Sequence, residues 1–227
     1  MASRPAWTVV NNQVIRKNYE FVFNPGFSKT QKQKNIQALH SAIGKKTLEV
    51  STKSLDALGV KLSAFNLKLQ DVPLECVFQS SKKYEKGGPY TDLMFMAPRD
   101  AKGDERHRNS GKIISFVYNG KEFPLEPKTI FYDYIYLKAI HEQLTMEELV
   151  EINQFEFFTD IEFNPQKSIN CQARSVAMIK VMLLMNCFQM NVIIKILFII
   201  LMMSQHMLYL ENLLVGFTTI QIMMGIK

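Results

Sequence analysis

A sharp change in composition near residue 184 limits how much of this chain can form one folded domain. Before it, charged residues, Gly and Pro are spread as in a globular protein, whereas the following LMNCFQMNVIIKILFIILMMSQHMLYL is rich in Met and Ile. The apolar stretch from about residue 182 to 203 approaches the ~20 residues of a membrane span, but Asn186, Gln189, Asn191 and Lys195 interrupt it. We therefore predict one domain over residues 1–183 and a hydrophobic tail over residues 184–227.

The tail has three interpretations: an aberrant segment, a hydrophobic helix packed on the domain, or a C-terminal membrane anchor. Its bias toward Met, Ile and Asn is what out-of-frame translation of AT-rich DNA would give, which favours the first. The polar residues that interrupt it would be costly in the middle of a bilayer, so the membrane anchor is the least favoured.

The bulk properties suit one globular domain. Of the 227 residues, 47% are hydrophobic and 21% charged, which excludes a wholly disordered chain. A net charge of +6 suits a protein that meets phosphates or nucleic acid, without requiring it. The N-terminus has no signal-peptide pattern, and we expect a cytoplasmic protein. The four histidines are scattered and do not have the spacing of a metal site. The three cysteines, Cys76, Cys171 and Cys187, have the spacing of neither a metal site nor a disulfide framework. We therefore expect no metal and no cofactor.

Capping and periodicity signals predict an α+β domain in which helix outweighs strand. A helix should begin after Ser28 and run to Ala42, ending at Gly44. Strands are expected in TLEVS (47–51) and AFNLKL (64–69), and a helix in PLECVFQSSKKY (73–84). Further helices are expected over residues 129–144, 145–152 and 167–184, the second capped by Thr145 with Glu148 three residues later.

The helix expected over residues 73–84 carries a polar stripe. Glu75, Gln79 and Lys82 stand at positions i, i+4 and i+7, which lie along one side of a helix. A carboxylate beside an amine can place a general acid or base next to a nucleophile. A half-exposed polar face with weak charge pairing explains the same spacing, and spacing alone favours that simpler interpretation.

A second polar cluster lies in TDIEFNPQKSINCQ, which contains Asp160, Glu162, Asn164, Asn170 and Gln172. Dense Asp and Asn around a Pro is typical of a turn and a helix cap. The alternative is a loop that lines a polar ligand pocket. Basic runs at residues 29–34, 82–83 and 106–108 are short, and each is more typical of a solvated face than of a nucleic-acid patch.

Several ordered motifs resemble the NADAR family, whose bacterial members are similar to the YbiA type. The family has a strand reading roughly L-S-N-F, and residues 62–65 read LSAF, followed by Asn66. The family's E-H-x-x-Q-x-x-K helix corresponds to ECVFQSSK at 75–82, with Cys76 in place of His. Its D-x-x-W-G corresponds to DIEFN, with Phe163 for Trp and Asn164 for Gly, and Asn170 matches a later Asn.

The chain is most similar to the NADAR antitoxins associated with DarT toxins. Phrases such as QKQKNIQALH, ECVFQSSKKYEKGGPY and PLEPKTIFYDYIY carry this resemblance over about residues 5–183. It implies a single YbiA-like domain that removes ADP-ribose from guanine bases in DNA and so reverses modification by a DarT-type ADP-ribosyltransferase. The implied ligands are ADP-ribose and ADP-ribosylated DNA, and the implied partner is the toxin.

The same resemblance implies roles for individual residues. Lys82 would attack the anomeric carbon of the distal ribose, Glu75 would move protons, and Asp160 would hold ribose hydroxyls or stabilise positive charge. Gln79 would orient the sugar, and the remaining ligand-binding positions would be Ser63, Phe65, Asn66, Phe163, Asn164 and Asn170. Replacing the family's His by Cys76 removes a titratable ring, and replacing Trp by Phe163 keeps an aromatic ring but removes an N–H donor.

Three other functions stay open at this point. One is an N-glycosidase acting on small nucleotide or riboflavin-pathway intermediates, as YbiA-type relatives suggest. Another is an ADP-ribose-binding antitoxin without turnover. The third is an antitoxin that neutralises its toxin by contact alone.

Overall fold

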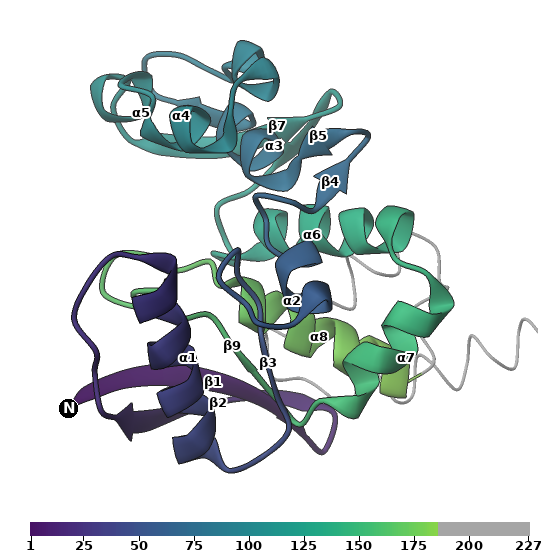
Figure 1. Ribbon diagram of the computed structural model, residues 1–227. Coiled ribbons are helices and arrows are strands. Elements are labelled where there is room, and N and C mark those ends of the chain that lie inside the picture. Colours follow the sequence, from purple (N-terminus) through teal and green to yellow (C-terminus); the bar gives the residue numbers. More distant parts are fainter. Residues whose placement is uncertain (186–227) are drawn as a thin grey trace, which may run out of the picture. The chain divides into compact units, whose positions relative to one another are not determined.

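The computed structural model describes residues 1–185 (Figure 1), and these belong to the first of two units into which the chain divides, Met1–Phe188 and Gln189–Lys227. The predicted tail lies almost entirely outside the described residues, so its three interpretations and the boundary at residue 183 remain predictions. Among the described residues no helix is both long and apolar enough to cross a bilayer.

The first unit is a mixed α+β domain with helices around small sheets, which confirms the predicted fold class. Its helices are α1 (Lys29–Ile43), α2 (Ala57–Lys61), α3 (Leu74–Ser80), the 3-10 helix η1 (Thr91–Phe95), α4 (Pro98–Gly103), α5 (Arg106–Asn109), α6 (Ile130–Gln143), α7 (Met146–Gln154) and α8 (Gln172–Leu184). Its strands are β1 (Ala2–Val10), β2 (Gln13–Phe21), β3 (Thr47–Glu49), β4 (Lys68–Leu69), β5 (Val72–Pro73), β6 (Lys82–Tyr84), β7 (Ile113–Tyr118), β8 (Lys121–Phe123) and β9 (Phe157–Thr159).

The largest sheet has the order β2-β1-β9-β3 and begins with a hairpin that the sequence analysis did not predict. β1 and β2 pair antiparallel from Ala2 opposite Phe21 to Val10 opposite Gln13. The turn between them is Asn11-Asn12, with φ of 49° and 57°. Two adjacent residues with positive φ are typical of a type I′ hairpin turn, and Asn tolerates that conformation well.

Helix α1 packs on this sheet through one apolar cluster. Ile36, Leu39 and Ile43 of α1 meet Phe21 and Phe157 from two of the strands. Helix α8 contacts β1, β2 and β9 of the same sheet and also packs against α6 and α7. Burial of these side chains, worth about 1.5–3 kcal/mol for each large apolar residue, fixes the strand that precedes residue 160 in place.

A buried charged group joins α6 to α8. Asp133 of α6 accepts hydrogen bonds from the Arg174 guanidinium at 2.5 Å and from the Ser175 hydroxyl at 2.7 Å. On the same helix α6, the Tyr136 hydroxyl donates to the Leu62 carbonyl and so anchors the turn that follows α2. These bonds satisfy polar groups whose burial without partners would be destabilising.

Most of the predicted helices are confirmed. Ser28 caps α1 by accepting a hydrogen bond from the Gln31 N–H at 3.2 Å, and Gly44 ends that helix with a φ of 65°. Thr145 and Glu148 form the expected capping box at the start of α7. The last helix begins at Gln172, five residues later than the predicted Lys167, because Asn164 and the residues after it form turns.

Two predicted elements are wrong in extent. Helix α3 ends at Ser80, because the Ser80 and Ser81 hydroxyls bond back to the Val77 carbonyl and residues 82–84 pair with β7 instead. Lys82 is therefore the first residue of a strand and not part of the helix. Of the strand expected over residues 64–69 only Lys68–Leu69 forms, since the Ser63 carbonyl closes a turn onto the next residues.

Candidate active site

The centre of the site is a line of hydrogen bonds from Glu75 through Gln79 to Lys82. The Lys82 ammonium donates to Gln79 Oε1 at 2.5 Å, and Gln79 Nε2 donates to Glu75 Oε1 at 2.8 Å. Glu75 is only 5% exposed and Gln79 only 4%. The interpretation of these residues as a solvated polar face is therefore wrong, although the helix ends before Lys82. The amide both accepts from the amine and donates to the carboxylate, so its orientation is fixed.

Lys82 is the first residue of β6, two residues after the end of α3, and it is half-buried. Burial lowers the pKa of Lys82 to about 8, with the Lys102 charge acting in the same direction and the Glu75 carboxylate opposing both. The ammonium also lies 5.2 Å from the centre of the Phe78 ring. An amine with a lowered pKa is partly neutral near physiological pH, and only the neutral amine is a nucleophile.

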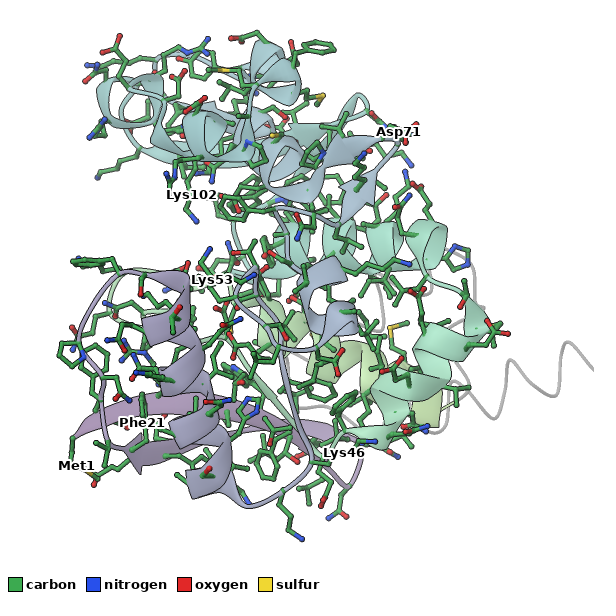
Figure 2. The ribbon with its side chains drawn as sticks, viewed as in Figure 1. Met1, Phe21, Lys46, Lys53, Asp71 and Lys102 are labelled. Carbon is green, nitrogen blue, oxygen red and sulfur yellow. The ribbon has the colours of Figure 1, made fainter. Side chains whose placement is uncertain are left out.

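Lys102 of α4 completes this side of the site, although no sequence motif predicts it. Its ammonium lies 3.4 Å from Glu75 Oε1 and 5.5 Å from the centre of the Phe65 ring. Figure 2 shows Lys102 projecting from α4 toward the part of the unit that carries Lys53. Helix α4 is short, and nothing in its local pattern marks Lys102 as different from the neighbouring surface residues.

Asp160 follows β9 and is linked to α3 through Gln172. The Gln172 amide donates to Asp160 Oδ2 at 3.0 Å and accepts from the Ala64 N–H at 2.5 Å. The Ala64 carbonyl in turn accepts from the Glu75 N–H at 2.9 Å. Residues far apart in the sequence are thus joined into one polar network. Burial raises the pKa of Asp160, and its hydrogen bonds to Gln172 and to backbone N–H groups oppose that rise.

Sequence reasoning missed Glu49, a second buried carboxylate next to Asp160. Its oxygens accept from the Thr159 hydroxyl at 2.7 Å and from the Ile161 N–H at 2.8 Å, the two residues that flank Asp160. Burial raises the pKa of Glu49, and the charge of Asp160 raises it further. The only sequence signal was a charged residue at an inward position of β3, where a carboxylate needs partners.

His40 extends this group from α1. Its Nε2 lies 2.9 Å from the Thr159 hydroxyl oxygen, and burial lowers the pKa of His40 to about 4. Among the described residues a cavity of about 220 Å³ opens beside it, lined by Ile36, His40, Thr47, Glu49, Ser54, Leu55 and Asp56. The cavity therefore lies beside Glu49 and does not include Lys82 or Glu75.

The remaining predicted ligand residues lie on the turns around these groups. Ser63 is buried, and its hydroxyl oxygen accepts from the Phe65 N–H at 3.4 Å. Asn66 is exposed and donates to the Val60 carbonyl at 2.9 Å. Phe163 is buried and closes a turn onto the Asp160 carbonyl at 3.1 Å. Their roles in ligand binding remain predictions.

The polar cluster around Pro165 forms the predicted turn, whereas a loop that lines a polar ligand pocket stays a prediction. Asn164 Oδ1 accepts from the Gln166 N–H at 2.9 Å, which is an Asx turn, while Asp160 joins the site. The Asn170 side-chain oxygen is buried and has no hydrogen-bond partner in the protein. A buried acceptor without a partner is costly, so this atom is suited to accept from a bound ligand.

Cys76, which replaces the family's His, faces away from this chemistry. It packs with Leu93 and Ala101, and its thiol donates to the Met96 carbonyl at 3.3 Å. Burial raises the pKa of Cys76 to about 11, so the thiol stays protonated at neutral pH. In the part of the chain that the structure describes, no three His, Cys, Asp or Glu side chains are grouped as a metal site requires.

The fold and the site define an α+β domain with a buried polar centre, in which an amine of lowered pKa is hydrogen-bonded through an amide to a carboxylate. The model of the family NADAR-DarT1, described as DarT1-associated NADAR antitoxin, matches residues 2–209. The chain belongs to this family, and the resemblance drawn from the sequence is confirmed. The matched range continues past residue 183, where the sequence analysis ended the resemblance. No curated protein matches the chain.

Proposed function

We propose that this chain is an ADP-ribosyl glycohydrolase that removes ADP-ribose from guanine bases in DNA and thereby acts as antitoxin to a DarT-type toxin in the cytoplasm. Membership of a DarT1-associated antitoxin family supports the biological setting. The single observation that carries the chemistry is the line Glu75–Gln79–Lys82, in which a half-buried amine is held beside a buried carboxylate.

In the proposed reaction the neutral amine of Lys82 attacks the anomeric carbon of the distal ribose. With a pKa of about 8, roughly a quarter of the Lys82 side chains are neutral at pH 7.5. A bond forms between Nζ and that carbon, and the bond to guanine breaks with its electron pair going to the base. Guanine takes a proton through Glu75, and the amine loses one, so protons balance.

The resulting adduct opens to a Schiff base between Lys82 and the open-chain sugar. Water then adds to the Schiff-base carbon, Glu75 moves the proton, and the free amine and ADP-ribose are regenerated. Asp160 holds ribose hydroxyls in this proposal, which its hydrogen bond to Gln172 supports, because Gln172 binds the Ala64 N–H and the Ala64 carbonyl accepts from the Glu75 N–H. Ordinary glycosidases place two carboxylates around the bond, whereas here the amine takes the nucleophile's role.

Groups near this centre are suited to bind the remaining parts of ADP-ribose. Lys102 supplies positive charge for the pyrophosphate, and the half-buried Phe65 ring, whose centre lies 5.5 Å from its ammonium, supplies an apolar face. The buried Asn170 oxygen supplies an acceptor that lacks a partner within the protein. We assign the remaining predicted ligand positions to sugar and base contacts: Ser63, Asn66, Gln79, Phe163 and Asn164.

The test is incubation with a guanine-ADP-ribosylated oligonucleotide, with release of ADP-ribose measured by mass spectrometry. Lys82→Arg keeps the positive charge but cannot supply a neutral amine, so turnover should fall by about 10⁴-fold or more. Borohydride added during turnover should give a reduced adduct on Lys82 that the variant does not form. Lys83→Arg is the matched control, because Lys83 is paired with Glu122 at 3.2 Å on the surface.

The other functions predict different outcomes of the same experiment. A glycosidase for small molecules would turn over a modified nucleotide-like intermediate and ignore the oligonucleotide. An ADP-ribose-binding antitoxin would bind the product without releasing it from DNA. A contact antitoxin would still neutralise its toxin when Lys82→Ala and Glu75→Ala are combined. Full turnover by Lys82→Arg would overturn the assigned nucleophile.

A further inference from the structure

The segment between β2 and α1 exposes apolar side chains that neither the core nor the site uses. Phe27 is 97% exposed, and Val22 and Phe23 of the same segment are also exposed. We call residues 22–28 the 22–28 loop. Single exposed apolar residues are common on protein surfaces, but three within seven residues, including an almost fully exposed phenyl ring, mark an interaction surface.

The 22–28 loop is held in one conformation by hydrogen bonds to α1. Asn35, which is buried in α1, accepts from the Asn24 N–H at 2.7 Å and donates to the Asn24 carbonyl at 2.8 Å. Ser28 closes the loop by capping α1. The exposure of Phe27 is therefore a feature of an ordered loop, and an ordered aromatic ring loses little entropy when it binds.

The first turns of α1, which follow this loop, are linked to Asp160. Lys32, in the first turns of α1, forms an ion pair with Glu162 at 3.3 Å, and the Glu162 N–H donates to Asp160 Oδ1 at 3.1 Å. In Figure 1 the chain that follows β9 and the chain that precedes α1 both reach the N-terminal end of α1. A strand of substrate that reaches Asp160 therefore passes near the start of α1.

Lysines adjoin the loop, and one of them, Lys32, is paired with Glu162. The first turn of α1 contains no acidic residue, and Lys29 there is exposed. Lys29 and Lys32 are three residues apart and so lie on one side of the helix, whereas Lys34 lies nearly opposite to Lys32. An exposed aromatic ring beside lysines is the combination that binds single-stranded nucleic acid, with bases stacking on the ring and phosphates meeting the ammonium groups.

We propose that the 22–28 loop and the adjoining lysines bind single-stranded DNA next to the modified guanine. Phe27 stacks on a neighbouring base, and Lys29 meets an adjacent phosphate. This proposal rests on the proposed function, because it names the part of the protein that recognises the DNA rather than the ADP-ribose. It also implies an unpaired substrate strand, since a base inside a duplex offers no free face to Phe27.

The experiment measures turnover of two substrates and, separately, binding of an unmodified oligonucleotide. Phe27→Ala should raise KM for a modified single-stranded oligonucleotide by about tenfold and leave kcat/KM for modified guanosine monophosphate unchanged. Phe27→Trp should keep oligonucleotide turnover, since it retains a stacking surface. Fluorescence anisotropy with an unmodified labelled oligonucleotide should show the same loss for Phe27→Ala, and Lys29→Ala should reduce the salt dependence of binding.

Two matched controls sharpen the test. Phe95→Ala removes a phenyl ring that is 90% exposed on η1, and Lys34→Ala removes an exposed lysine from the other side of α1; neither should alter oligonucleotide binding. Unchanged binding and KM in Phe27→Ala would overturn the proposal, as would an equal loss in Phe95→Ala. Loss of toxin binding alone would overturn it in favour of a protein partner. If the wild type releases no ADP-ribose but the Phe27 effect on anisotropy persists, the glycohydrolase assignment fails and the DNA surface stands.

Discussion

At the scale of single residues, Gln79 has the most constrained role in the site. Its amide carbonyl faces the Lys82 amine, and its NH₂ group faces the Glu75 carboxylate. The amide carries an acceptor oxygen and a donor NH₂ group at one end of the side chain and has no charge. The neutral amide orients the amine, and burial lowers the pKa of Lys82 to about 8.

Gln79→Glu should therefore move the pH dependence of turnover. A carboxylate in contact with the Lys82 ammonium stabilises the charged form, so the pKa of Lys82 rises and the rising limb of kcat/KM shifts by about one pH unit to higher pH. The profile would be measured on modified guanosine monophosphate between pH 6 and 10. Gln154→Glu is the matched control, because Gln154 accepts from Lys46 at 3.0 Å on the surface. An unshifted limb in Gln79→Glu would mean that a group other than Lys82 controls it or that the new carboxyl shares a proton with Glu75, which lies 2.8 Å from the Gln79 amide.

At the scale of elements, the sequence predicts those whose signals are local. Ser28 and Gly44 mark α1, and Thr145 with Glu148 marks the start of α7, because caps satisfy backbone groups within one turn. The end of α3 at Ser80 could not be predicted, since it depends on pairing between β6 and β7. Helical spacing placed Lys82 correctly beside Gln79 even though Lys82 belongs to a strand.

The parts of the site contributed by distant elements were the hardest to predict. Glu49 and Lys102 reach the site only because β3 pairs with β9 and because α4 packs on α3. No local pattern distinguishes Lys102 from a surface charge, and the only signal for Glu49 was its charge at an inward position of β3. The family motifs quoted from the sequence include neither residue. Glu75, Gln79, Lys82 and Asp160 were found because an ordered family resemblance linked them, and the structure brings them into one network through Gln172 and Ala64.

The capping box of α7 gives a prediction about one element. Thr145 accepts from the Glu148 N–H at 3.3 Å, and the Glu148 side chain accepts from the Thr145 N–H at 2.9 Å while also binding Lys61. Thr145→Ala should lower the free energy of unfolding by about 1 kcal/mol, measured by urea denaturation. Thr145→Ser keeps the cap and should change it little. Equal losses in the two variants would show that the methyl group, rather than the cap, is responsible.

At the scale of the whole molecule, the buried carboxylates couple the stability of the fold to pH. Burial and the charge of Asp160 raise the pKa of Glu49 to about 7. A carboxyl group whose folded pKa is raised contributes stability below its unfolded pKa, and that contribution is lost as pH rises through about 7.

His40 affects stability in a different pH range. Its pKa is lowered to about 4, so its contribution to the free energy of unfolding is lost as pH falls from about 6.5 to 4. Lys82, lowered to about 8, loses its own contribution as pH falls from its unfolded value of 10.5 through about 8.

Between pH 6 and 8 the ionisation of Glu49 should therefore lower the free energy of unfolding, and Glu49→Gln should remove that loss. The amide can accept from the Ile161 N–H and donate to the Thr159 hydroxyl, which then donates to His40 Nε2, as the protonated carboxyl would. The free energy of unfolding of Glu49→Gln minus that of the wild type should therefore increase by about 1 kcal/mol between pH 6 and pH 8. Urea denaturation of both proteins at the two pH values measures this difference. Glu156→Gln, which removes an exposed carboxylate paired with Lys45, is the control and should show no such change. A difference between Glu49→Gln and wild type that stays constant with pH would show that Glu49 is ionised throughout this range, with Asp160 holding the proton.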